Sequence, residues 1–466
     1  AKVIKLEQNY RSTQNILDAA NSVIANNVGR KTKRLWTDNG QGDKITFEQL
    51  DTANEEADYV ARDIARHVRK GEYQYKDCAV LYRTNAQSRL FEERFIAANI
   101  PYKIVGGVNF YSRKEVKDIL SYLKTIDNGH DDLAVRRIIN VPKRGIGATT
   151  INRVSNYAAE NDMDFYTALT KASEIPGIGK AATKVEPFVL FIQSMRAKAE
   201  IESVSELLRD IIETTGYVHE LEAEGTDEAE ARIENIDELI SKACDYEDGE
   251  EHPTLSGFLE EVALVADIDS LDEDSDYVVL MTLHSAKGLE FPNVYLAGME
   301  DGLFPSYMSI TSDNASAEIE EERRLAYVGI TRAKKNLTIT SARVRMVRGQ
   351  TQYGAVSRFV KEIPPELLAG EIYEPCSYEE PVQESSFQKA RKAFRSVPDY
   401  GNTASQSDGY RNNANGSSGK YSSYGSEVGE GYGSTFGRRK PAAPVYTKPS
   451  NQRDFGSVAD GDNWLT

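Results

Sequence analysis

The chain has 466 residues, of which 40% are apolar and 28% charged, and its formal net charge is −17. This length predicts two or three domains rather than one. The sequence contains no apolar run of about 18 residues or more, so we expect no membrane span. The first residues lack a secretory signal pattern, and the three widely spaced cysteines fit neither a disulfide framework nor a zinc site. We therefore expect a cytoplasmic protein.

The negative charge is concentrated in one part of the chain. Residues 201–276 contain 26 acidic and 3 basic residues, a net of −23, which leaves +6 for the rest of the sequence. The total charge therefore does not exclude nucleic acid as a partner. We interpret the acidic stretch as a solvated helical face.

Short apolar segments predict buried strands at residues 45–47, 78–82, 102–105, 277–283 and 294–297. Several are near-continuous apolar runs, the pattern of a parallel sheet covered on both faces. Residues 57–68, between the first two segments, carry apolar side chains at helical spacing. Strands that alternate with helices predict an α/β fold with a parallel sheet.

The alternation stops over about 111–276, where apolar residues recur at helical spacing. We expect a largely helical accessory domain (106–276) inserted into an α/β domain (1–105 and 277–368). Its junctions would lie near 106–107 and 271–276, where turn-forming or charged residues gather. Residues 369–466 are expected to form a disordered tail, because a segment rich in Gly, Ser, Asn and Tyr buries too little apolar surface. A plain linker and a weak contact with nucleic acid both remain open for it.

Three charged blocks are candidates for chemistry: LEQNYRS (6–12), TLHSAKGLE (282–290) and EERRLAYVGITRA (321–333). The second block follows a predicted strand, and α/β folds place ligand-binding loops at the carboxyl ends of strands. Each block taken alone also fits a helix cap or a salt-bridged surface.

In this order and spacing the blocks resemble motifs IV, V and VI of the UvrD/PcrA/Rep family of superfamily 1 DNA helicases. A fourth block, YRTNAQSR (82–89), resembles that family's YRxNxQSR block. The resemblance runs from about residue 3 to residue 365. It implies the second RecA-like core domain of such a helicase, with the family's accessory domain inserted into it.

The resemblance implies one set of residues that contact ATP. Tyr10 matches the aromatic residue that stacks on adenine, and Arg11 and Arg332 match the arginines that reach the γ-phosphate. Glu290 matches a ribose contact, and Gly288 lets the backbone approach the phosphates. Planar guanidinium groups stabilise the charge that spreads over the phosphate oxygens during phosphoryl transfer. ATP with Mg²⁺ is the implied cofactor.

A second set matches positions that contact single-stranded DNA in the family. Its members are Arg83, Asn85, Arg89, Thr282 and His284. Donors of this kind hold phosphates without reading the base sequence. The last two also match residues that link the nucleotide cleft to the bound strand.

The accessory domain contains PKRGIGATT (142–150), which resembles the family's GIG motif for duplex phosphates. Gly145 and Gly147 would expose backbone N–H groups, and Lys143 and Arg144 would add positive charge. A second segment, PGIGK (176–180), fails the P-loop pattern. A helix–turn–helix contact with phosphate and a simple turn both remain open for it.

Residues 344–352 resemble the family's strand-separating hairpin, the pin. Alignment on Gly349 places Arg348 where the family usually has an aromatic residue at the tip. A different register would place Tyr353 there instead.

The sequence lacks G-x-x-x-x-G-K-[ST], and the family's Mg²⁺-binding acids and water-orienting glutamine belong to an N-terminal core domain. Removal of an initiator methionine is one explanation for the start at Ala1; a fragment that begins inside a longer protein is our expectation. We therefore expect the C-terminal portion of an ATP-dependent 3′→5′ DNA helicase, inactive alone, whose partners are single-stranded DNA and the junction with duplex. Repair or transcription proteins would bind the tail or a further C-terminal domain. A non-catalytic nucleic-acid-binding or regulatory module is the alternative, and a nuclease fusion finds no acidic cluster to support it.

Overall fold

A parallel β-sheet forms from apolar segments that lie far apart in the sequence. The computed structural model describes residues 7–28, 34–266 and 276–372. Within them the strand order is β10-β1-β7-β5-β2-β4-β3, with every neighbouring pair parallel, and β8 pairs antiparallel with β7. The strands are β1 (Ile45–Thr52), β2 (Cys78–Tyr82), β3 (Tyr102–Val105), β4 (Val278–Thr282), β5 (Phe291–Leu296), β7 (Ala333–Val347), β8 (Gln350–Tyr353) and β10 (Leu368–Ala369). The expected α/β fold with a parallel sheet is confirmed.

The longest strand, β7, was not among the predicted strands. Its segment is not a continuous apolar run, because Thr, Ser and Arg residues interrupt the apolar ones. One buried polar group in it has a partner from another element: the Thr340 hydroxyl donates to Glu56 at 2.7 Å. Such partners remove the cost of burial. The apolar pattern therefore identified the other central strands and missed this one, apart from the hairpin expected at its end.

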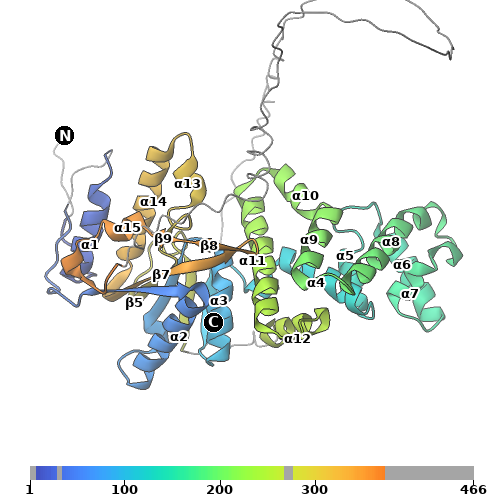
Figure 1. Cartoon of the computed structure of the whole chain (residues 1–466), viewed down its shortest axis with the longest axis horizontal. Coiled ribbons are helices and arrows are strands. Elements are labelled where there is room, and N and C mark those ends of the chain that lie inside the picture. Colours follow the sequence, from blue (N-terminus) through green and yellow to red (C-terminus); the bar gives the residue numbers. More distant parts are fainter. Residues whose placement is uncertain (1–6, 29–33, 267–275, 373–466) are drawn as a thin grey trace, which may run out of the picture. The chain divides into compact units, whose positions relative to one another are not determined.

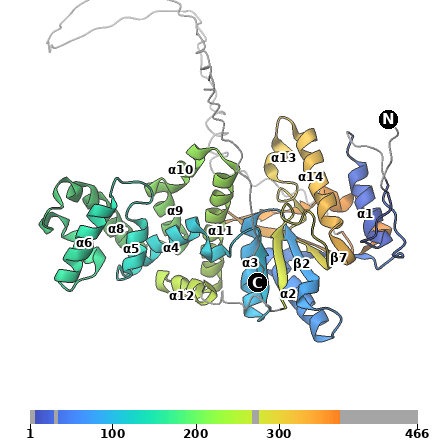
Figure 2. The ribbon, with the colours of Figure 1, turned by 180° about the vertical axis from the view of Figure 1, so that it is seen from behind.

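Helices cover both faces of the sheet because successive side chains of a strand point to opposite faces. In β2, Ala79 and Leu81 pack in one apolar core with residues of α1 (Gln14–Ala25) and α14 (Ala315–Ile330). Cys78, Val80 and Tyr82 pack in the other with residues of α2 (Ala53–Arg69) and α3 (Ser88–Ala97). Figures 1 and 2 show the sheet between these pairs of helices. The predicted helix at 57–68 lies within α2.

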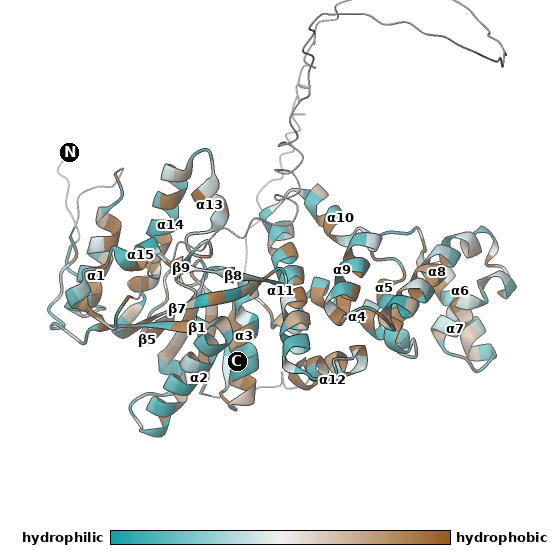
Figure 3. Cartoon of the chain, viewed as in Figure 1, coloured by the Kyte–Doolittle hydropathy of each residue, from teal (hydrophilic) through white to brown (hydrophobic). Residues whose placement is uncertain are grey.

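The chain between β3 and β4 is helical in its described residues and has an apolar core of its own. The helices are α4 (Lys114–Asp127), α5 (Asp132–Ile138), α6 (Ala148–Glu160), α7 (Phe165–Thr170), α8 (Ala182–Ala199), α9 (Val204–Thr215), α10 (Tyr217–Glu224), α11 (Asp227–Gly249) and α12 (Leu255–Ala266). In Figure 3 these helices carry both apolar and polar surfaces, as expected of helices that bury one side. Helix α9 begins at a capping box formed by Ser203 and Glu206 and ends at Gly216, whose φ is +68°. The predicted change from alternating strands to helices is confirmed.

The acidic stretch is a solvated face only in part. Glu222, Glu224 and Glu228 are exposed, as expected. Glu238 and Asp245 of α11, in contrast, form ion pairs with Arg89 of α3, whose side chain is only 2% exposed. The sequence interpretation missed this because the basic partner lies about 150 residues away in the chain.

Short elements complete the described part of the chain. They are α13 (Tyr307–Thr311), α15 (Arg358–Lys361) and the antiparallel pair β6 (Glu300–Asp301) and β9 (Ala355–Val356). No helix in the described ranges is long and apolar enough to cross a membrane. The expected tail lies outside the described residues, apart from its first four positions.

Candidate nucleotide and nucleic-acid site

Positively charged side chains gather at the edge of the sheet where β5 and β7 begin. The Asn9 carboxamide oxygen accepts from the backbone N–H of Arg11 at 2.7 Å and of Ser12 at 2.9 Å, which fixes the turn before α1. The Ser12 hydroxyl donates to the carbonyl of Ala333 at 2.6 Å. These contacts bring Arg11 beside Arg332, although 320 residues separate them in the sequence.

Glu290 lies between two cations at this edge. The Arg11 Nε donates to its Oε2 at 2.5 Å, and the Lys334 Nζ lies 2.8 Å from its Oε1. Hydrogen bonds from Lys334 and Arg11 lower the pKa of Glu290 to about 2. The carboxylate therefore stays ionised at neutral pH, and it is 41% exposed. The expected ribose contact and one expected phosphate contact are thus bound to each other.

Arg332 meets neutral acceptors instead of a carboxylate. Its Nε donates to the carbonyl of Val328 at 3.0 Å and its Nη1 to the carbonyl of Leu289 at 2.9 Å. Burial, and then the charge of Arg11, lowers its pKa. Among the described residues no carboxylate lies within ion-pair distance of it. A cation held in this way keeps its charge available for an anion.

Two further expected residues lie near this edge. The Tyr10 side chain is 80% exposed, and its hydroxyl donates to the Gln8 side chain at 2.8 Å, so a face of its ring is open for stacking. Gly288 has a φ of +93°, a conformation that favours glycine, and a Cβ there would have no neighbour within 4 Å. Backbone can therefore be approached closely at Gly288.

A second cluster lies at the opposite edge of the sheet, where β2 and β4 end. Arg83 forms a two-pronged contact with Glu322 of α14 at 2.8 to 3.1 Å. His284 lies near this pair, and partial burial together with the charge of Arg83 lowers its pKa. Thr282, the last residue of β4, shares a hydroxyl contact of 3.0 Å with Ser285. Asn85 begins a short 3₁₀ turn at 85–87.

The block at 282–290 runs from one edge to the other. Its start lies at the carboxyl end of β4, as expected, where Leu283 N–H donates to the carbonyl of Tyr82 at 2.8 Å. Its end, Glu290, lies at the amino end of β5 instead. Leu283 and Ala286 are fully buried and anchor the segment. The block therefore connects the two clusters within one short stretch of chain.

Arg89 is not placed with these residues. Its side chain is 2% exposed and pairs with Glu93 at 3.2 Å, Glu238 at 2.7 Å and Asp245 at 3.1 Å. All its charge is used inside the protein, so it presents no donor to a DNA strand in this structure. A buried guanidinium with three acid partners has a structural role between α3 and α11.

The GIG segment lies between α5 and α6. Gly145 has a φ of +70° and is exposed, and Gly147 caps the start of α6. Lys143 is exposed, whereas Arg144 turns inward: its Nη1 donates to the carbonyl of Ile138 at 2.9 Å and its Nη2 to the Tyr122 hydroxyl at 2.5 Å. Arg144 therefore fixes the loop, and the groups open to a ligand are Lys143 and the backbone.

The expected hairpin at 344–352 is present as β7 and β8. Val347 pairs with Gln350, so Arg348 and Gly349 form the two-residue tip. The Arg348 Nε lies 2.8 Å from Asp237 of α11. Tyr353 lies at the far end of β8, 85% exposed, and is not at the tip.

Sequence reasoning missed Lys334 and Glu322, the partners of Glu290 and Arg83. Lys334 is the second residue of β7 and follows Arg332, which precedes the strand, by two positions. Glu322 lies inside the quoted block 321–333 but gave no signal apart from its charge. A predicted strand at β7 would have drawn attention to Lys334.

Comparison with known proteins identifies the family of the chain. A family model described as the UvrD-like helicase C-terminal domain matches residues 4–344. The chain is 48% identical over 370 residues to the ATP-dependent DNA helicases PcrA of Staphylococcus epidermidis and Staphylococcus aureus. These alignments cover 79% of this chain and 50% of each relative. The chain thus spans about half the length of the curated relatives it matches.

A solved structure, the C-terminal domain of a possible DNA helicase from Lactobacillus plantarum WCFS1, aligns over 77% of this chain and 97% of its own. Its sequence identity is 11% and its TM-score is 0.31, values too low to support a conclusion about this chain. The family model and the PcrA relatives carry the conclusion. The chain belongs to the UvrD-like helicase C-terminal domain family.

Proposed function

We propose that this chain is one core portion of an ATP-driven DNA helicase, with residues 1–105 and 277–368 as the motor domain and 106–276 as its accessory domain. The observation that carries the proposal is the edge cluster of Arg11, Arg332 and Lys334. Arg11 and Lys334 share one exposed carboxylate, Glu290, and Arg332 has no carboxylate partner among the described residues, which leaves net positive charge for a polyanion. Triphosphate is an anion that such donors suit.

At the nucleotide edge, the γ-phosphate would take the donors of Arg332 and draw Arg11 away from Glu290. The freed carboxylate would accept from a ribose hydroxyl, and the ring of Tyr10 would stack on adenine. No group of three metal-binding side chains occurs in the described ranges. Mg²⁺ would be held by acids of the other core domain together with the phosphates, as the resemblance implies.

At the opposite edge, Arg83, Asn85, Thr282 and His284 would contact single-stranded DNA. The segment 283–290, anchored by its buried residues, would transmit changes at the phosphates to this edge. Closing and opening of the cleft between two core domains would then step the strand 3′→5′. Lys143 with the backbone of Gly145 and Gly147 would hold the duplex, and Arg348 would lie at the point of strand separation.

The test is DNA-stimulated ATP hydrolysis by two proteins. One is the chain alone, and the other is the chain joined to the part of Staphylococcus epidermidis PcrA that the alignment leaves uncovered. We expect no turnover from the first and clear turnover from the second. Arg332→Ala in the joined protein should lower the rate by about 10³-fold or more, the effect of removing an arginine that stabilises the transferred phosphoryl group.

Two results would contradict the proposal. Turnover by the chain alone that Arg332→Ala abolishes would show that no other core domain is needed. A joined protein that binds DNA but never hydrolyses ATP would favour a non-enzymatic nucleic-acid-binding module instead. The matched control is Lys335→Ala, which removes an exposed cation of β7 three residues after Arg332.

A further inference from the structure

Helix α11 presents two neighbouring faces to two different parts of the sheet domain. Glu238, Lys242 and Asp245 form ion pairs with α3, where Arg89 and Glu93 are the partners. The residues directly before these three are Asp237, Ser241 and Cys244, and they contact the hairpin tip instead. Residues spaced by three and four share one face of a helix, so these two sets form two stripes side by side.

The hairpin tip that contacts the second stripe is strained. Arg348 and Gly349 have φ values of +56° and +66°, the pattern of a two-residue turn of type I′. Glycine, asparagine and aspartate suit such positions, whereas arginine pays a steric cost in the left-handed region. A strained residue persists where surrounding contacts fix it, and such residues gather at functional sites.

Contacts at both ends fix this hairpin. At its base, Arg345 of β7 forms buried ion pairs with Glu56 at 2.6 Å and with Glu300 at 2.9 Å. At its tip, Gly349 N–H donates to the Ser241 hydroxyl at 3.3 Å. The Gly349 carbonyl accepts from Arg209 of α9 at 3.5 Å.

The residues of α9 and α11 that contact the hairpin tip leave no room for a larger residue at position 349. A Cβ there would lie 3.0 Å from the Cys244 Sγ and 3.0 Å from the Ile240 Cγ2, and it would overlap the Arg209 guanidinium. Gly349 therefore serves both the turn and the close approach to α11.

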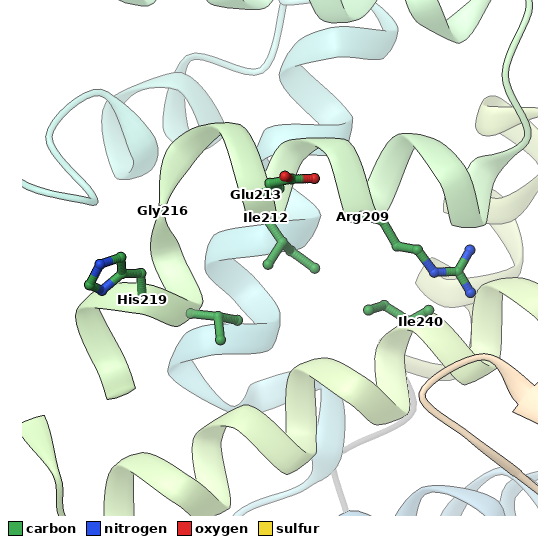
Figure 4. A pocket seen from close by; sticks show the side chains of 7 residues that line it. Arg209, Ile212, Glu213, Gly216, His219 and Ile240 are labelled. Atoms are coloured by element: carbon green, nitrogen blue, oxygen red, sulfur yellow. The ribbon is translucent and has the colours of Figure 1, made fainter. Parts of the chain in front are cut away.

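Arg209 and Ile240 also border a hollow of about 340 Å³ between α9, α10 and α11 (Figure 4). Its other lining residues are Ile212, Glu213, Gly216, Val218 and His219.

We propose that α11 positions the hairpin tip, with Ser241 and Arg209 holding the backbone and Asp237 holding the Arg348 side chain until a DNA phosphate replaces the carboxylate. This inference rests on the proposed function. Arg348 is 70% exposed, so a phosphate can reach its guanidinium from solvent. DNA phosphates at a junction offer anionic oxygen acceptors at a higher density of negative charge than one carboxylate.

Asp237 is suited to be the returning partner. Its side chain is 23% exposed, and burial raises its pKa while Arg348 opposes that rise. Loss of Arg348 would leave a mostly buried carboxylate without its cation, which is unfavourable. The tip should therefore return to α11 when DNA leaves.

The contact between the hairpin tip and α11 is tested by the reactivity of Cys244, a partly buried thiol whose Sγ lies 3.9 Å from the Gly349 carbonyl oxygen. Cys376→Ser gives a background in which the other remaining thiol, Cys78, is fully buried. Gly349→Ala should raise the maleimide labelling rate of Cys244 about tenfold, because local opening exposes the thiol. The control is Gly225→Ala, which has a similar φ of +59° but no neighbour within 4 Å of an added Cβ.

A labelling rate unchanged by Gly349→Ala would contradict the proposal that α11 positions the hairpin tip. An equal rise in Gly225→Ala would do the same, because backbone strain alone would then explain the effect.

The exchange is tested by the affinity of the chain for a forked DNA, measured by fluorescence anisotropy over a range of salt concentrations. Arg348→Asn keeps a residue that tolerates the turn, and it should weaken binding several-fold and reduce the salt slope by about one phosphate contact. Asp237→Asn should tighten binding about threefold more than Glu230→Gln, which removes an exposed charge from the same helix. The gain should vanish when Arg348→Asn is also present.

A gain that persists without Arg348, or one equal to that of Glu230→Gln, would overturn the exchange. If the unsubstituted chain binds no DNA, the proposed function and the exchange fail together. The labelling experiment uses no DNA and would still decide whether α11 positions the hairpin tip.

Discussion

The contact between α3 and α11 and the edge where β5 and β7 begin both gather arginines, yet the two regions use the charge differently. Arg89, between the helices, is 2% exposed and pairs with three carboxylates. Arg332, at the edge, is partly buried and meets backbone carbonyls. The first arginine has no charge left for a ligand, and the second retains it. Partners supplied by distant segments, rather than the local motif, separate the two roles.

The largest expected effect comes from removing Arg89. Arg89→Met leaves Glu93, Glu238 and Asp245 without a shared cation in a mostly buried site. Breaking a buried ion pair costs about 3–5 kcal/mol, so we expect a loss of this size in the free energy of unfolding. Urea denaturation followed by circular dichroism measures it.

The matched control is Arg324→Met. Arg324 is 47% exposed and pairs with Glu320 and Glu321 on its own helix, so its loss should change stability by less than about 1 kcal/mol. If Arg89→Met unfolds like the unsubstituted protein but binds single-stranded DNA more weakly, Arg89 is a strand contact and the comparison between the two regions fails.

The sequence predicted the fold well because the fold depends mainly on local apolar patterns. Residues 78–82 and 102–105 form strands with the bounds expected. The first is a continuous apolar run, and in the second only Lys103 interrupts the apolar residues. β7 was not predicted because Thr338, Thr340 and Ser341 take up several of its buried positions and interrupt the apolar pattern. A strand of this kind depends on tertiary contacts, which a local sequence pattern does not show.

The sequence indicated which residues lie together at the candidate site better than it indicated how their side chains are oriented. Arg11, Glu290 and Arg332 lie together, as the resemblance implied. The inward turns of Arg89 and Arg144 and the ion pair of Arg348 were not foreseen, because each depends on acceptors from other helices or loops. A motif gives the type of side chain, and the tertiary structure decides which way it faces.

A smaller effect is expected from Arg332→Met. Its acceptors are carbonyls of Val328 and Leu289, so the change should cost about 1 kcal/mol of stability or less. The variant should instead lose the rise in melting temperature, a few degrees, that tripolyphosphate produces by binding the folded protein. Thermal unfolding with and without tripolyphosphate separates the two effects.

Lys335→Met is the control for this comparison, because Lys335 is exposed and adjacent strand residues point to opposite sides. It should keep the full shift with tripolyphosphate. An equal loss in both variants would mean that the anion responds to overall charge and not to the position of Arg332.

The smallest effect concerns Glu290, whose pKa of about 2 lies below that of an unfolded glutamate. A carboxyl group with a lowered pKa stabilises the folded state above its unfolded pKa, and that contribution is lost as the pH falls toward the folded pKa. The stability difference between the unsubstituted protein and Glu290→Gln should therefore be constant from pH 7 to about 5 and shrink between about 4.5 and 2. Since the side chain is 41% exposed, the difference at pH 7 should stay below about 1 kcal/mol and decrease further in high salt. Urea midpoints measured at several pH values test this, and a difference that grows as the pH falls would show that Arg11 and Lys334 do not hold the Glu290 carboxylate in the folded protein.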